Sequence, residues 1–171
     1  MDVQYRELPA PLEVRSLPQR ILAGPIIPLG VDRQVDPYTV ERFDPPASRH
    51  QYKAADRIVL RAGHSNAPGS LLLGRCLELD EADGSLCAQF RVVQSEIGDH
   101  WLALAREHVI GAVQWSIGFV PFKTRMDGRT TVHTRADLFE TALVGEGAYG
   151  PAAQVMSVRA TLGKLKNWLS P

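Results

Sequence analysis

Two strand-like stretches separated by an Asp-Gly turn constrain this 171-residue chain more than any other feature. Residues 71–79 form a largely apolar run, and apolar and polar residues alternate over 85–93. An alternation of period two is typical of a strand with one buried face. The inward set of the second stretch is expected to be Leu86, Ala88, Phe90 and Val92. Residues 80–84 lie between the two runs and end in Asp-Gly, a hairpin-turn signal. The sequence therefore predicts an antiparallel hairpin here.

Further strands and one helix are predicted around this hairpin. Apolar strand patterns cover residues 20–29, 57–62, 112–120 and 137–144. Between Ser95 and Gly111 the spacing becomes helical, with Ser95 as N-cap and Gly111 as terminator. The apolar face of this helix is expected to contain Ile97, Trp101, Leu104, Ala105 and His108. Short helices are compatible with 151–156 and 162–169. The predicted fold class is a β-dominated α+β domain, a small closed or folded-over antiparallel barrel with one main helix and short terminal helices.

The chain divides into three parts by composition. Residues 1–20 are punctuated by proline and are expected to be a flexible arm or an edge strand. Residues 21–158 are expected to form one folded domain, and 159–171 a tail. Inside the domain, residues 30–53 show little periodicity, and a loop of that length indicates a functional element. We expect it to be a flap or a self-association surface.

Composition excludes several classes of protein. Lys plus Arg (19) equals Asp plus Glu (19), so the chain lacks the cationic excess of a nucleic-acid binder. No apolar run reaches the roughly 18 residues that a membrane span needs, and no signal peptide is recognised, so we expect a soluble intracellular protein. Cys76 and Cys87 cannot form a disulfide framework, and the cysteines and histidines lack metal-ligand spacing. No glycine-rich phosphate loop follows a strand, so no metal or organic cofactor is expected.

Three side chains stand out as candidates for chemistry, each with a structural alternative. His64 closes one strand and opens a turn at a sheet rim, where a structural role is also open. Ser116 lies in an apolar strand, where serine is often only a tolerated small residue. By alternation Glu140 should share a face with Leu138, so it needs either solvent or a partner such as an imidazole N–H. Pattern alone does not bring the three together.

The remaining signals are weaker. Gly118, two residues after Ser116, indicates a place where another backbone approaches closely, as a bound peptide would. The other four histidines are expected to be solvated or to lie at the helix surface: His50, His100, His108 and His133.

From about residue 21 to 158 the chain resembles the prohead maturation proteases of tailed bacteriophages, which are related to the herpesvirus assemblin serine proteases. The landmarks that carry the resemblance occur in the family's order: 21–30 (ILAGPIIPLG), 41–43 (ERF), 59–64 (VLRAGH), 73–75 (LGR), the 80–86 hairpin, 114–119 (QWSIGF), 138–144 (LFETALV) and 150–153 (GPAA). The chain departs from the family pattern at Ser65, Thr141, Ala142 and residues 44–48, none of which is a presumed catalytic group.

The resemblance implies a herpesvirus-protease-like fold and a serine endopeptidase. It makes Ser116 the nucleophile, His64 the general base and Glu140 the third member of the triad. Oxyanion donors would be backbone N–H groups with help from an arginine, for which Arg135 and Arg159 are guesses.

The resemblance also implies a biological setting. Substrates would be scaffolding and major capsid protein segments, and the protease itself, cleaved inside the immature capsid in the host bacterial cytoplasm. A homo-oligomer is possible in the family. Two other functions remain open: a catalytically silent capsid-assembly module of the same fold, and a small β-barrel binding domain without a viral role.

Overall fold

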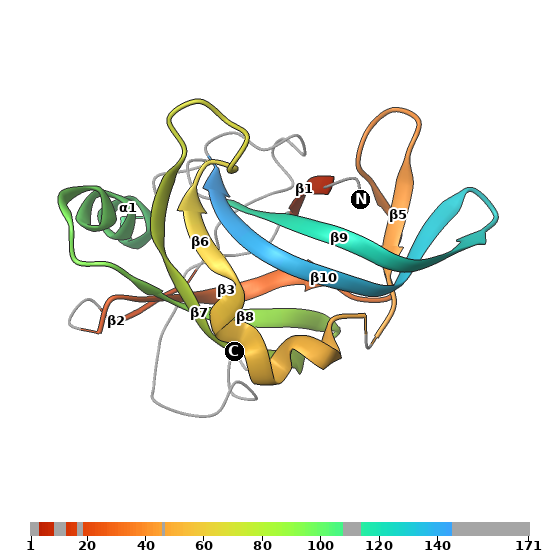
Figure 1. Ribbon diagram of the computed structural model, residues 1–171, viewed down its shortest axis with the longest axis horizontal. Helices are drawn as coiled ribbons and strands as arrows, with labels where there is room; N and C mark the ends of the chain where they lie inside the picture. The colour runs from red at the N-terminus through yellow and green to blue at the C-terminus, as the bar shows by residue number, and fades with distance from the viewer. Residues whose placement is uncertain (1–3, 9–12, 17–18, 46, 108–113, 145–171) are drawn as a thin grey trace.

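Strands dominate the computed structural model, which describes residues 4–8, 13–16, 19–45, 47–107 and 114–144 (Figure 1). Within these residues one α-helix, α1 (Glu96–Arg106), and one 3-10 helix, η1 (Arg49–Arg57), accompany ten strands. The strands are β1 (Gln4–Leu8), β2 (Glu13–Ser16), β3 (Ile21–Pro28), β4 (Arg33–Gln34), β5 (Val40–Phe43), β6 (Val59–Ala62), β7 (Leu71–Ala82), β8 (Ser85–Val92), β9 (Gln114–Asp127) and β10 (Thr130–Val144). The predicted β-dominated class is confirmed. The suggested helices at 151–156 and 162–169 lie outside the described residues.

The strands form one mixed sheet in the order β1-β9-β10-β6-β7-β8-β3-β2, and β5 also pairs with β10 and carries β4 on its other side. Most pairs are antiparallel, but β10 runs parallel to both β5 and β6. The prediction of a wholly antiparallel sheet is therefore wrong at β10. Because β6 and β10 run parallel, both strands end at the same edge of the sheet, and the candidate site forms near that edge.

The sheet curls so that strands far apart in its order meet. Its two end strands, β1 and β2, are consecutive in sequence, and Leu8 and Glu13 are five residues apart, which limits their separation to about 18 Å. Phe90 of β8 and Trp115 of β9 are not on neighbouring strands, yet their ring centroids lie 5.4 Å apart. Figure 1 shows β3 and β8 crossing beneath β9 and β10. The sheet is folded over, and the described pairings do not close it into a barrel.

The predicted hairpin is confirmed in its turn and in its buried face. Asp83 and Gly84 have φ of 47° and 71°, the two positive values that a tight two-residue hairpin turn requires. The predicted inward side chains are all buried: Leu86, Ala88, Phe90 and Val92. β7 extends to Ala82, three residues beyond the predicted run.

The helix begins as predicted and ends earlier. The Gly98 amide donates to Ser95 Oγ at 3.1 Å, which satisfies one of the free N–H groups of the first turn. Its buried residues are Gly98, Leu102 and Ala105, with Ile97, Trp101 and Leu104 half-buried against the core. The last helical residue is Arg106, not the residue before Gly111. Nowhere in the described part of the chain is a helix long and apolar enough to cross a membrane.

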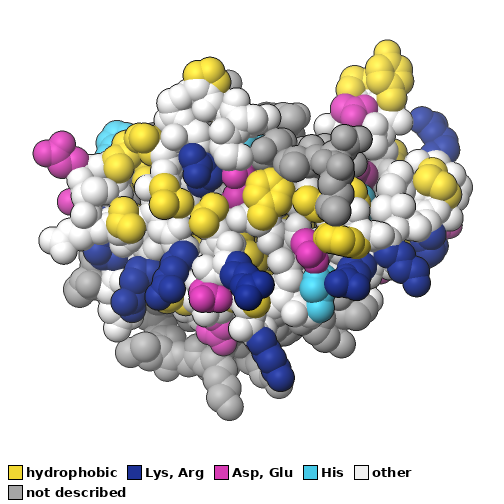
Figure 2. Space-filling model, in the orientation of Figure 1, with side chains coloured by type: hydrophobic (Ala, Val, Ile, Leu, Met, Phe, Trp, Pro, Cys, Tyr) yellow, Lys and Arg dark blue, Asp and Glu magenta, His cyan; other side chains and the backbone are white. Residues whose placement is uncertain are grey.

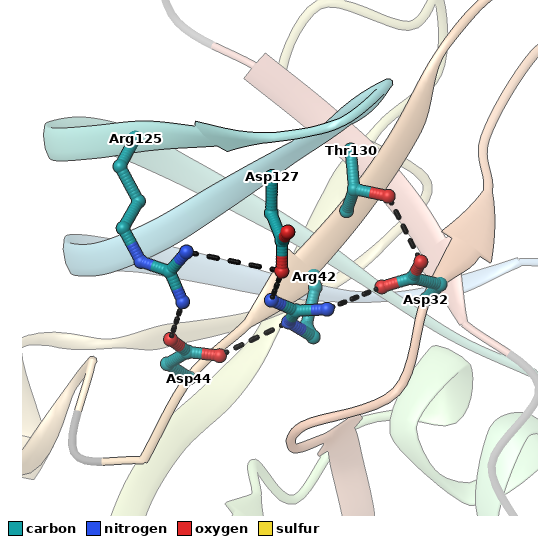
Figure 3. A network of polar contacts seen from close by, with 6 residues as sticks. All are labelled: Asp32, Arg42, Asp44, Arg125, Asp127 and Thr130. Atoms are coloured by element: carbon teal, nitrogen blue, oxygen red, sulfur yellow. Dashed lines mark hydrogen bonds and ion pairs between the residues drawn. The ribbon is translucent and has the colours of Figure 1, made fainter.

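Residues 30–53 are not a free flap, because β4, β5 and the start of η1 lie within them. Phe43 is buried in the core, and its ring contacts Phe119 at a centroid distance of 5.1 Å. The segment is fastened to the far end of the β9–β10 ribbon by ion pairs that centre on one guanidinium (Figure 3). Arg42 donates to Asp32 at 2.9 Å, to Asp44 at 3.1 Å and to Asp127 at 2.5 Å.

The β9–β10 ribbon is longer than predicted. The predicted strands cover 112–120 and 137–144, whereas residues 121–127 continue β9 and 130–136 belong to β10. This outer part of β9 is exposed on both faces, so it has no apolar alternation to reveal it. Exposed hydrophobic side chains gather here and near β5 (Figure 2): Val31, Tyr38, Phe122 and Met126. A second group lies along β7 and just after β8: Leu71, Leu72, Leu77 and Val93.

Candidate active site

His64, Ser116 and Glu140, which are far apart in sequence, meet in the structure. His64 Nε2 lies 2.6 Å from Ser116 Oγ, and His64 Nδ1 lies 2.7 Å from Glu140 Oε1. Ser116 is on β9, and Glu140 is on the neighbouring β10. His64 lies two residues after the end of β6, which borders β10 on its other side. The three side chains therefore form one continuous chain of hydrogen bonds across three adjacent strands.

The alternation of β9 places Ser116 away from the core. Trp115, Ile117 and Phe119 belong to the hydrophobic core, so Ser116 and Gly118 project to the opposite face. Ser116 is nevertheless 0% exposed. A buried hydroxyl needs a hydrogen-bond partner, and the imidazole of His64 supplies one.

A β-bulge re-aims Glu140, and it corrects the predicted facing of this residue. Across the ladder Leu138 pairs with Phe119, whereas Glu140 pairs with Gly118, so two steps along β10 match one step along β9. Leu138 consequently faces the core while Glu140 faces the side that bears Ser116. Strict alternation put Leu138 and Glu140 on one face and was wrong, because the extra residue changes the phase of the strand.

His64 is held by a hydrogen-bonded turn rather than by a strand. Gly63 has φ of 71°, a left-handed conformation in which only glycine is free of strain, and its amide donates to Leu143 O at 2.9 Å. Ser70 Oγ donates to Gly63 O at 2.8 Å and accepts from Arg61 Nε at 2.8 Å. These contacts fix the turn to β10 and to β6, and so fix the place from which the imidazole projects.

The arrangement has the geometry for passing a proton between Ser116 Oγ and His64 Nε2. Because a carboxylate only accepts, Glu140 holds the ring proton on Nδ1, which leaves the Nε2 lone pair toward the Ser116 hydroxyl. The Ser65 amide also donates to Glu140 Oε1, at 3.3 Å. Glu140 is 1% exposed and the His64 side chain 12%, so water is largely excluded from the path. Ser65 was noticed in the sequence only as a departure from a family pattern, because a main-chain donor leaves no trace in residue type.

Two arginines were suggested as oxyanion donors. Arg135 pairs with Lys123, seven residues along β9 from Ser116, or roughly 23 Å away. Its guanidinium instead lies 5.4 Å from the centre of the Phe122 ring. That suggestion is therefore wrong for Arg135, while Arg159 lies outside the described residues.

The other histidines differ from one another. His133 was expected in solvent but is 1% exposed, stacked on Phe43 at a ring-centroid distance of 4.7 Å and 3.5 Å from Glu41. It lies within residues 130–136, the part of β10 that was not predicted. His50 is exposed and contacts Asp137 through Nε2, His100 is exposed on α1, and His108 lies outside the described residues. Within the described segments no three His, Cys, Asp or Glu side chains are grouped to hold a metal ion.

Comparison with known proteins gives a structural match. No protein-family model and no curated protein matches this sequence. Among solved structures the chain is similar to the bacteriophage T4 capsid assembly protease, gp21, with a TM-score of 0.58 and 10% sequence identity. The match covers 82% of this chain and 96% of that one. The chain has the fold of a phage capsid assembly protease.

Proposed function

We propose that this protein is a serine endopeptidase of phage capsid maturation, with Ser116 as nucleophile, His64 as general base and Glu140 as the carboxylate that orients it. The observation that carries the proposal is the unbroken Ser116–His64–Glu140 hydrogen-bond chain, with contacts of 2.6 Å and 2.7 Å. The gp21 fold supports it independently, since that neighbour is a capsid assembly protease.

The roles follow from the geometry. As Ser116 Oγ attacks the scissile carbonyl, its proton passes to His64 Nε2, and the Glu140 carboxylate stabilises the imidazolium that forms. His64 then gives the proton to the leaving amine, which releases one peptide and leaves an acyl group on Ser116. Water, deprotonated by the same imidazole, hydrolyses this ester and restores the serine.

The substrates we propose are scaffolding and major capsid protein segments inside the immature capsid, together with the protease itself. These assignments, and action as a homo-oligomer, rest on the resemblance to prohead maturation proteases, and the fold of a capsid assembly protease supports the setting of capsid assembly.

The test is cleavage of a co-expressed capsid precursor by the parent chain and by Ser116→Ala. We expect the variant to lose at least about 10⁴-fold in rate and to keep the parent melting temperature. Ser48→Ala is a matched control, because Ser48 is also a buried serine but donates to Ala136 O, outside the site. A fluorophosphonate should label Ser116 alone. Cleavage by Ser116→Ala at the parent rate would refute the nucleophile, and a folded parent that never cleaves or labels would favour a catalytically silent assembly module.

A further inference from the structure

Both edges of β9 are occupied at the candidate nucleophile. On one side β10 pairs with it along its whole length and places Ala142 opposite Ser116. On the other side β1 pairs antiparallel over Gln4–Leu8 and places Glu7 opposite Ser116. The N-terminal segment was expected to be a flexible arm or an edge strand, and in the structure its residues 4–8 lie beside the nucleophile as a strand.

An extended polypeptide reaches a nucleophile within a strand by adding itself to a free edge of that strand. The β10 edge cannot be freed, because β10 also carries Glu140 and pairs with β5 and β6. The β1 edge is different. β1 is the end strand of the sheet, contributes five residues and has β9 as its pairing partner.

We propose that the β1-side edge of β9 is the peptide-binding site and that residues 4–8 are its resident, displaceable occupant. The inference rests on the proposed function and adds to it a substrate geometry and a means of restraint. Substrate is an extended segment that runs antiparallel to β9, past Ser116, along the line that β1 now follows. Main-chain hydrogen bonds bind it, as they bind β1.

The covalent tether makes this occupant an effective competitor. β2 is paired with β3 at Glu13–Ser16, so residues 4–8 stay within a few residues' reach of the edge even when they leave it. A short tether holds a segment at an effective concentration in the millimolar range. A dilute polypeptide therefore does not displace residues 4–8 from the edge of β9. Substrate concentrated inside a capsid shell competes with them for the same edge. The 0% exposure of Ser116 agrees with a closed resting state.

Variants that release β1 test the proposal. Successive N–H groups of a strand point to opposite sides, so prolines at two adjacent positions must remove at least one ladder hydrogen bond. Arg6→Pro with Glu7→Pro should raise the rate of cleavage in trans and of Ser116 labelling at least tenfold, as should deletion of residues 1–8. Arg33→Pro with Gln34→Pro makes the same change in β4, another short edge strand that takes no part in the tether, and should leave both rates unchanged.

A binding assay separates this inference from the proposed function. A fluorescent peptide of residues 1–12 should bind the deletion chain carrying Ser116→Ala and should bind full-length Ser116→Ala at least tenfold more weakly. Hydrogen exchange on the full-length proline variant gives a second reading that does not require the deletion to fold: amides of residues 115–119 should exchange faster than in the parent. Equal peptide binding to both chains, or unchanged exchange, would overturn the inference. Absence of cleavage and labelling in every variant, with the binding difference intact, would instead overturn the endopeptidase.

Discussion

Gly118 lies directly opposite Glu140 across the β9–β10 ladder, and the Glu140 side chain fills the space above it. A Cβ at position 118 would come within 2.6 Å of Glu140 Cγ and 2.8 Å of Phe139 Cζ, closer than real Cβ contacts. The missing side chain of Gly118 is therefore what lets Glu140 lie flat against β9 and reach the imidazole. The glycine at position 118 predicted that another backbone approaches β9 closely. In the structure the β1 backbone pairs with it there, and the Glu140 side chain also lies against it.

Gly118→Ala should move Glu140 away from β9 and lengthen its contact with His64. A displacement of about 1 Å in a catalytic group costs up to 10²-fold in rate, so we expect a 10- to 100-fold loss of kcat/KM. Circular dichroism should show the parent fold. Cleavage at the parent rate would mean that the shift of Glu140 is tolerated and that Glu140 does not determine the orientation of the His64 imidazole.

Glu140→Gln keeps the shape of the side chain and removes its charge. The amide can donate to Nδ1, which favours the wrong ring tautomer and cannot stabilise the imidazolium, so we expect a loss of about 10³- to 10⁴-fold in kcat. Glu41→Gln is a matched control, because Glu41 is equally buried and also faces a histidine, His133, outside the site. Equal losses in both variants would point to general destabilisation rather than to a role in the proton path.

The sequence predicted the elements whose residues alternate between a buried and an exposed face. The β7–β8 hairpin, the start of α1 and the strand around Ser116 belong to this group. The outer part of β9 was missed because both of its faces are exposed, so residues 121–127 resemble a turn. The part of β10 that pairs with it, residues 130–136, was missed because buried His133 and Thr130 interrupt its apolar pattern.

Within the site, residue types were predictable but their geometry was not. His64, Ser116 and Glu140 could be selected from motif order, yet the facing of Glu140 depends on a bulge between Leu138 and Glu140 that alternation cannot reveal. The pairing of β1 beside Ser116 was also beyond reach, since a five-residue edge strand is set by its partner more than by its own sequence. Long-range pairing, rather than local propensity, assembles this site.

Both cysteines should be inert in the folded protein. Cys76 and Cys87 are buried, and burial raises the pKa of the Cys76 thiol to about 12. Since the thiolate is the reactive form, iodoacetamide at pH 8 should label neither residue in the native state and both in denaturant. Cleavage should be unaffected by the reagent. If iodoacetamide labelled one of the thiols in the native protein, the buried environment would be contradicted. If that labelling also abolished cleavage, a thiol rather than Ser116 would be indicated as the reactive group.

The ion pairs at the far end of the β9–β10 ribbon should make the stability of the folded protein depend on pH. The hydrogen bond from Arg42, together with its charge, lowers the pKa of Asp127 below its ordinary value of 3.8. A carboxyl with a depressed folded-state pKa stabilises the fold above its unfolded pKa, and this contribution is lost as pH falls through the folded value.

Asp127→Asn should accordingly lower the melting temperature slightly at pH 7, and the difference from the parent should shrink as the pH falls below about 4. The effect should also shrink in 1 M salt, because the pairs are exposed and screened. Asp83→Asn is the control: Asp83 lies in the β7–β8 turn, asparagine tolerates its positive φ, and no ion pair is seen for it among the described residues. A difference between Asp127→Asn and the parent that is the same at pH 7 and pH 2 would show that Asp127 acts through packing and not through its charge.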